Sequence, residues 1–405
     1  KMLTDICFKF ALESLKKCML MEPKESIFFS PNLIYQNLMC VYFAANGDIE
    51  NSLRQILYIP DNISKNDFEL RYKSECDQLC YRINGPSYIC KTYSLFYIND
   101  IHILRQKAFE LFMSGHQIIK NTKFDHDTGN TINFINAVVK SVTQGCIRNL
   151  LPPKSIDSNT DVLLIKSIYL EGQLNFDSDI ESDNSNCKNT NNDRNFKNIF
   201  GKSEQLNAYI TELPLDQNNI SVFFLNPLHY LECDENCSVK NDTVIQLIER
   251  LLTEEGCQIL RKLLDDGVQK QSYIFPTFEF EQDMRICELL EMLGVRDLTP
   301  FGSEEVDLSG FTFQSNVKLG NAVHRVNIKM QGDSIIAAAS NALFTNNFWR
   351  HFRIKCIMDV PFPCICLIYD RSRRNILFCG VLFSKVDESR VADTSECKIR
   401  KHTLV

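Results

Sequence analysis

Residues Ser334–Ser340 of this chain have the sequence Ser-Ile-Ile-Ala-Ala-Ala-Ser, and residues Thr345–Phe352 have the sequence Thr-Asn-Asn-Phe-Trp-Arg-His-Phe. The first stretch contains only small and β-branched residues, which fit easily into a β-sheet. In the second stretch, Trp349 is the only tryptophan of the chain, and its neighbours do not alternate with the spacing of a buried element. The pattern predicts an exposed loop that presents aromatic side chains to a partner. A segment that can become a strand precedes this loop.

Helical patterns dominate the first part of the chain, and strand patterns dominate the later part. Ser30-Pro31 marks one helix start, because proline suits the first helical turn. Strands and helices do not alternate, so the sequence predicts an α+β protein with mainly antiparallel sheets. We expect helices at 5–21, 31–42, 49–57, 67–82, 105–113, 130–149 and 243–264, strands at 162–169, 208–213, 220–225 and 273–280, and a solvated loop at 177–198.

The composition excludes several classes of function. Apolar residues make up 44% and charged residues 23%, as is typical of a soluble globular protein with a large core. A net charge of -7 favours neither nucleic acid nor an anionic membrane as a partner. No apolar run has membrane-spanning length, and we expect no signal peptide and no membrane span. The chain could be cytoplasmic or secreted, and 17 cysteines, mostly among apolar residues, favour free thiols and an intracellular location.

Three peptides resemble catalytic or metal sites but lack the groups that would complete them. The tripeptide Gly332–Ser334 is similar to the nucleophile motif of trypsin-like proteases, but two isoleucines follow it and no histidine lies in a matching peptide. The pairs Cys76–Cys80 and Cys233–Cys237 have the spacing of zinc half-sites without second halves. We therefore expect neither catalysis nor a metal or other cofactor.

Short peptides along the whole chain resemble, in order and spacing, the motifs of one family, the serpins. The matching peptides are Ser26–Pro31, Phe43–Gly47, Leu150–Pro153, Ile168–Gly172, Phe275–Phe280, Leu293–Val295, Asp307–Gly310, Val323–Arg325, Pro361-Phe362 and Ile376–Gly380. The resemblance implies an α+β serpin fold with three β-sheets, about eight or nine helices and an exposed reactive-centre loop. It places that loop at about 332–357 in a single domain over residues 1–381, followed by a flexible C-terminal extension, 382–405.

The family's mechanism implies what the loop does. A native serpin resembles a loaded spring, because its five-stranded sheet becomes more stable when the loop inserts as a further strand. A target protease forms an acyl-enzyme at the P1 residue, and insertion of the cut loop then distorts the protease before deacylation. The resemblance thus implies a monomeric suicide substrate with a serine protease as its partner. We expect no nucleic-acid partner and no insertion into a membrane.

The resemblance also assigns roles to particular residues. Ser30 and His324 would form the shutter beneath the sheet opening. The hinge of the loop would consist of Ser334, Ile335, Ile336, Ala337, Ala338, Ala339 and Ser340. Its alanines fulfil the requirement for small, uncharged residues.

Several positions depart from the family pattern. Ser334 stands where a hinge glycine is usual, and Ile335 and Ile336 replace a Thr-Glu pair, so that an inward-facing isoleucine must fit a tightly packed slot. Gly332 replaces the glutamate of a salt bridge at the base of the loop. The remaining departures are Leu33 for a serine, Lys166 for an asparagine and Leu174 for a tryptophan.

The scissile bond has two possible positions. Counting forward from the hinge gives Phe348 as P1 and Trp349 as P1′, which implies a chymotrypsin-like target with an apolar S1 pocket. Counting back from Pro361 gives Arg350 and His351, which implies a trypsin-like target. We favour Phe348, because an inserted strand has a fixed length per residue. A non-inhibitory serpin that acts as a binding or carrier protein is a third possibility, suggested by the hinge departures.

Overall fold

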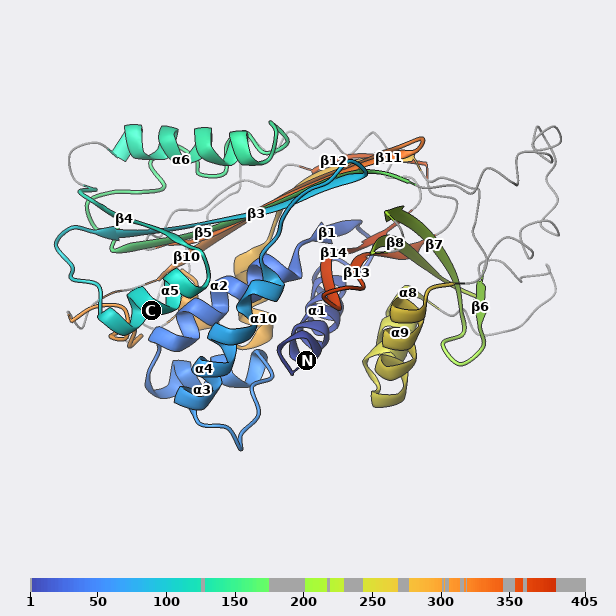
Figure 1. Cartoon of the computed structure of the whole chain (residues 1–405), viewed down its shortest axis with the longest axis horizontal. Coiled ribbons are helices and arrows are strands. Elements are labelled where there is room, and N and C mark those ends of the chain that lie inside the picture. The colour runs from blue at the N-terminus through green and yellow to red at the C-terminus, as the bar shows by residue number, and fades with distance from the viewer. Residues whose placement is uncertain are drawn as a thin grey trace, which may run out of the picture.

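The computed structural model describes residues 2–383 except 125–127, 175–200, 217–218, 229–242, 269–276, 301, 303–305, 314–316, 318, 345–353 and 360–362. The described residues form nine α-helices and two large, mainly antiparallel sheets (Figure 1). The α+β class and the expected number of helices are confirmed. The third expected sheet is not among the strands described.

The larger sheet has the strand order β12-β9-β10-β11-β5-β3-β2. Strand β4 pairs in parallel with the C-terminal part of β3, Leu95–Asn99. All its other pairings are antiparallel. The strands are β2 (Arg82–Asn84), β3 (Tyr88–Asn99), β4 (Ile118–Thr122), β5 (Val162–Gln173), β9 (Thr277–Met284), β10 (Asn321–Gln331), β11 (Ser334–Phe344) and β12 (Ile354–Asp359). Strand β11, which the sequence predicted as the hinge of a loop, is therefore an interior strand.

The smaller sheet has the order β1-β14-β13-β8-β7-β6 and packs beneath one end of the larger one (Figure 1). Its strands are β1 (Ile27–Phe29), β6 (Gly201–Ser203), β7 (Ala208–Asp216), β8 (Ile220–Pro227), β13 (Cys364–Asp370) and β14 (Asn375–Leu382). Gly380 is required here, because a Cβ atom on it would lie 2.3 Å from the carbonyl oxygen of Ile27. Strand β1 can approach β14 only with glycine at this position.

Helices cover both faces of the larger sheet. Helix α6 (Thr128–Val142) lies across the outer face, and the other described helices lie beneath the inner face (Figure 1). Those others are α1 (Met2–Met21), α2 (Pro31–Ala44), α3 (Gly47–Ile56), α4 (Lys65–Glu75), α5 (Gln106–Ser114), α8 (Val244–Leu252), α9 (Glu254–Asp266) and α10 (Ile286–Leu293). Among the described helices, none combines the length and apolarity that a bilayer crossing requires.

The sequence missed some elements and extended others. The predicted helix at 67–82 ends at Glu75, continues as a short 3-10 turn (Cys76–Leu79), and is followed by β2. Strand β3 was not predicted, because its alternation is interrupted by polar residues that its position in the sheet accommodates. The predicted helix at 243–264 is two helices, since Thr253 caps α9 by accepting a hydrogen bond from the N–H of Gly256.

Candidate functional site

Strands β10 and β11 form a tight hairpin at the base of the predicted loop. Gln331 pairs with Ser334, so only Gly332 and Asp333 form the turn. Gly332 has φ +60, which glycine adopts without strain, and glycine at the first turn position is typical of a type II′ hairpin. The carbonyl of Asp333 also accepts a hydrogen bond from the N–H of Leu174 at 2.7 Å. Glycine at position 332 thus directs the chain back into the sheet at once.

Strand β11 pairs along its whole length with β10 on one side and β5 on the other, from Ser334 opposite Gln173 to Phe344 opposite Leu163. The expectation of an exposed loop does not hold for Ser334–Phe344, because these residues lie in the sheet as in the inserted arrangement. Main-chain pairing on both edges and small side chains allow this placement.

The two isoleucines of the hinge fit the sheet. Ile335 is 0% exposed and packs in the core between the two sheets with Ala337 and Ala339. Ile336 lies on the opposite face, partly buried against the core beneath α6. The side chains of consecutive residues alternate between the faces, so the two β-branched residues occupy separate cores. The tight slot predicted for Ile335 is therefore filled by it.

The alanines allow α6 to approach the sheet. Ala338 and Ala342 of β11 are buried in one core with Ile135 and Val139 of α6. A long or charged side chain at position 338 would have to displace the helix or bury its charge. This geometry gives a physical reason for small residues at these positions.

The two predicted shutter residues lie in contact beneath the sheet. The N–H of Ser30 donates to Nε2 of His324 at 3.1 Å, and the Ser30 hydroxyl donates to the carbonyl of Leu377 in β14 at 2.7 Å. Ser30 thus connects β10 of the larger sheet to the smaller sheet. Complete burial lowers the pKa of His324 to about 3, so the imidazole is neutral at physiological pH.

Two contacts of β11 were not predicted from the sequence. The hydroxyls of Ser340 and Ser167 lie 2.8 Å apart on the face beneath α6. On the opposite face, Asn37 Nδ2 of α2 donates to Asn341 Oδ1 at 2.6 Å. The two asparagines are 304 positions apart in the chain, and no local pattern in the sequence indicates that they meet.

Lys166 is a buried cation in this region. It is 2% exposed, and its ammonium group donates to the hydroxyl of Ser94 at 3.1 Å. Lys166 pairs with Asn341 on one side and with Ser94 on the other. Lysine in place of the family's asparagine at position 166 therefore puts a basic side chain beside β11.

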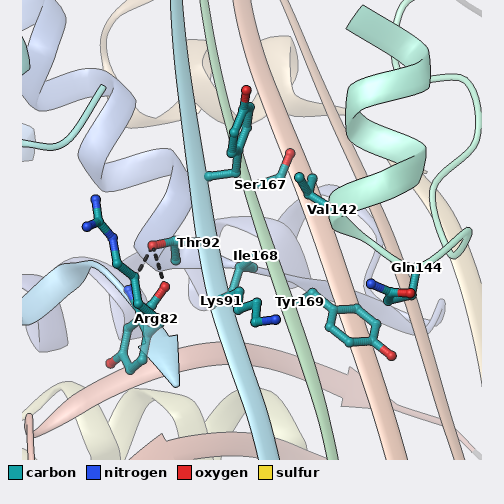
Figure 2. Close-up of a pocket in the computed structure, with 10 residues that line it drawn as sticks. Arg82, Lys91, Thr92, Val142, Gln144, Ser167, Ile168 and Tyr169 are labelled. Carbon is teal, nitrogen blue, oxygen red and sulfur yellow. Dashed lines mark hydrogen bonds between the residues drawn. The ribbon is translucent and has the colours of Figure 1, made fainter. Parts of the chain in front are cut away.

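A cavity of 310 Å³ opens beside β5, the strand that pairs with β11 (Figure 2). Strands β3 and β5 form its floor and the C-terminal end of α6 one wall. Its lining residues are Tyr81, Arg82, Lys91, Thr92, Tyr93, Val142, Gln144, Ser167, Ile168 and Tyr169. Because Ser167 lines this cavity and contacts Ser340, one side chain connects the cavity to the inserted strand.

Some predicted residues lie outside the described part of the chain. These are both candidates for the scissile bond, Phe348-Trp349 and Arg350-His351, and the pair Cys233–Cys237. Twelve of the cysteines in the described part are free thiols. Among them, Cys364 and Cys366 lie on the same face in the core between the sheets, as their spacing predicted. No group of three or more metal-ligating side chains occurs in the described residues.

The chain is similar to known proteins along nearly its whole length. A family model described as Serpin (serine protease inhibitor) matches residues 6–385. Serine protease inhibitor 88Ea of Drosophila melanogaster is 25% identical over 390 residues, which cover 92% of this chain and 88% of that protein. Serpin B5 of Homo sapiens is 24% identical over 397 residues, which cover 92% of this chain and 96% of that protein.

Solved structures show the same fold. A loop-inserted, P1-P1′ cleaved ovalbumin mutant superposes with a TM-score of 0.70 at 17% identity, covering 95% of this chain and 100% of that one. Tengpin, a thermophilic serpin in the latent state, gives a TM-score of 0.68 at 18% identity, with 95% and 98% covered. The ordered motifs, the inserted hairpin strand and these similarities lead to one conclusion: the chain belongs to the serpin family of serine protease inhibitors.

Proposed function

We propose that this serpin inhibits a chymotrypsin-like serine protease as a suicide substrate, with Phe348 as P1 and Trp349 as P1′. The observation that carries the proposal is the placement of β11 as a fully paired strand between β5 and β10. An inhibitor of this kind needs a loop whose N-terminal half can occupy such a position. The hinge of this chain does so, including its two isoleucines.

The chemistry is that of an interrupted proteolysis. The protease serine oxygen attacks the carbonyl carbon of Phe348 and forms an ester, the amide bond to Trp349 breaks, and the protease histidine donates a proton to the leaving amine. Insertion of Ser334–Phe344 then moves the ester-linked protease with the strand. The inhibitor residues supply the bond and the strand, and the protease supplies the catalytic groups.

The length of the inserted segment favours Phe348 over Arg350. Strand β11 ends at Phe344, so Phe348 lies only a few residues beyond the paired part. A strand advances about 3.3 Å per residue, and each additional residue leaves the protease farther from the end of the sheet. The shorter connection to Phe348 transmits the pull of insertion more directly.

The test is complex formation with chymotrypsin. We expect an SDS-stable complex that is lost in Phe348→Ala, because an apolar S1 pocket needs the ring, and lost in Ala338→Arg, because the loop cannot insert. Arg350→Ala is the matched control and leaves the complex intact. Cleavage of the wild-type loop without complex formation would contradict the proposal.

A trypsin-like target with Arg350 as P1 is the second candidate, favoured by the count back from Pro361. Mass spectrometry of the released C-terminal peptide separates the two candidates. The peptide begins at Trp349 if Phe348 is P1 and at His351 if Arg350 is P1.

A non-inhibitory binding or carrier protein is the third candidate, favoured by the departures at Ser334, Ile335 and Ile336. The burial of Ile335 within the sheet weighs against it. Cleavage of the loop followed by thermal melting separates this candidate from the inhibitors. A rise in melting temperature supports insertion, and an unchanged melting temperature supports the carrier.

A further inference from the structure

The inward face of β11 contains one polar residue. Residues Ile335, Ala337, Ala339, Asn341 and Leu343 alternate onto this face. The apolar members pack in the cores beneath the sheet. Asn341 is 1% exposed, so its amide group is buried and needs hydrogen-bond partners. A buried amide of this kind is favourable only at a position in the sheet where it finds hydrogen-bond partners.

Both ends of that amide group have partners. Its oxygen accepts from Asn37 Nδ2 at 2.6 Å, and its own Nδ2 donates to the carbonyl of Val323 in β10 at 3.3 Å. Asn37 Nδ2 also approaches the backbone carbonyl of Asn341 at 3.4 Å. The partners thus come from α2 below the strand and from the neighbouring strand.

Asn37 is directed at this position by its helix. It is 0% exposed, and both hydrogen bonds of its Nδ2 described above go to Asn341. On the same helix, Gln36 points elsewhere and donates to the carbonyl of Leu79 at 3.0 Å. Helix α2 therefore presents one amide to the inserted strand.

The pairing register gives this contact its meaning. Asn341 lies between His324 of β10 and Lys166 of β5, so the three polar residues form a row across the sheet. A slip of one residue would turn Asn341 to the face beneath α6, and a slip of two would bring an apolar residue opposite Asn37. Either slip leaves buried amide groups without partners, which is costly.

We propose that Asn341 and Asn37 form an amide pair that positions the reactive loop during insertion and fixes how far it inserts. The proposal rests on the proposed inhibitory function, because positioning matters only if the loop inserts after cleavage. Asn341 belongs to the mobile element and Asn37 to the fixed helix, so the contact forms only when the strand is in place. The two are positioning residues, and neither touches the protease.

A double-mutant cycle in two states of the protein tests the amide pair. Asn37→Ala, Asn341→Ala and the double variant are each prepared intact and after limited proteolysis within residues 345–353. Guanidinium denaturation then gives the coupling between the two positions. In the cleaved form we expect a coupling of about tenfold in the unfolding equilibrium constant. In the intact form the coupling measures how far β11 already occupies the sheet position described above.

Ser340→Ala is the matched control. It removes a hydroxyl from the adjacent residue of β11, whose partner Ser167 lies on the opposite face. Combined with Asn37→Ala, it should show no coupling in either form. Ala339→Asn with Asn341→Ala retains one amide on the same face but moves it by two residues, and it should not restore the stability of the cleaved form.

The fraction of loops that end in complex provides the readout of positioning. We expect Asn341→Ala to shift the products of the chymotrypsin reaction severalfold from SDS-stable complex toward free cleaved protein, while Ser340→Ala changes them little. Absent coupling in the cleaved form overturns the amide pair. Cleavage without complex in the wild type overturns the inhibitory function alone, since the coupling in the cleaved form is measured independently.

Discussion

Strands β11 and β14 are both buried on both faces, but their side chains differ in kind. Strand β14 contains Phe378, which stacks on Phe28 with ring centroids 5.9 Å apart, and Gly380, which lets β1 approach closely. Strand β11 contains four alanines and three small polar residues among its eleven positions. Large interlocking side chains define a strand that remains in the core. Small side chains with few specific partners suit a strand that enters a completed sheet, because entry requires little repacking.

The largest expected effect concerns a charge on the inward face of β11. Ala337→Asp would bury a carboxylate among apolar side chains, so insertion should fail completely. We expect cleavage to raise the melting temperature of the wild type and to leave that of this variant unchanged. Circular dichroism melts of intact and cleaved protein check this, with Ala337→Ser as the control of similar size. An equal rise in the Asp variant would contradict the assignment of β11 as the inserted strand.

Strand β14 should respond in the same way in both states. Phe378→Ala removes a ring that is 0% exposed and should lower the free energy of unfolding by about 3–5 kcal/mol. Because β14 does not depend on insertion, the loss should be similar in intact and cleaved protein. Guanidinium denaturation of the two forms measures it. A loss confined to one form would remove the contrast between β14 and β11.

A low pH should destabilise the folded protein at the contacts of Ser30 and His324, which lie between β11 and β14. Ser30 contacts His324 beside β11 and Leu377 in β14, and burial lowers the pKa of His324 to about 3. In the unfolded chain the imidazole has its ordinary pKa of about 6.5 and takes up a proton below that pH, whereas the folded protein keeps it neutral. The stabilisation is thus complete above about pH 6.5 and decreases as the pH falls toward 3.

When the pH falls from 7 to 5, we expect the titration of the His324 imidazole in the unfolded chain to lower the free energy of unfolding by about 2 kcal/mol. Denaturation at the two pH values, compared with the His324→Gln variant, isolates this part, because glutamine does not titrate there. If both proteins lose the same stability, the buried imidazole is not responsible.

The smallest effect concerns the outer face of β11. Ser340→Ala removes one neutral hydrogen bond to Ser167 and should lower the stability of the cleaved form by about 1 kcal/mol. The intact form should be nearly unaffected if Ser340 lies outside the sheet there. Denaturation midpoints of both forms decide, and an equal loss in the intact form would indicate that the intact protein in solution keeps Ser340 in the sheet, as in the structure described above.

Much of the fold could be predicted because its signals are local. Ser30-Pro31 begins α2, and the run from Ser334 to Ser340 has the composition of a strand with small side chains. The hairpin turn at Gly332 was not predicted, although its glycine is a local signal. The family motifs assigned Ser30 and His324 to one region, and the structure adds the contact between them. Strand β3 was missed because its polar residues acquire neighbours only in the sheet, and β4 pairs with it in parallel, which no local pattern indicates.

The sequence by itself determined the family, the α+β class and the position of a segment of small residues that suits a strand, because these depend on residue order and on the conformational preferences of short peptides. Only the tertiary structure decided that Ile335 fits the slot, that Lys166 bonds to Ser94, and that Asn341 meets Asn37. These contacts join residues far apart in the chain, and their geometry depends on the strand register and on the helix packed beneath it. A buried amide acquires its role from such partners, and the sequence around it does not identify them.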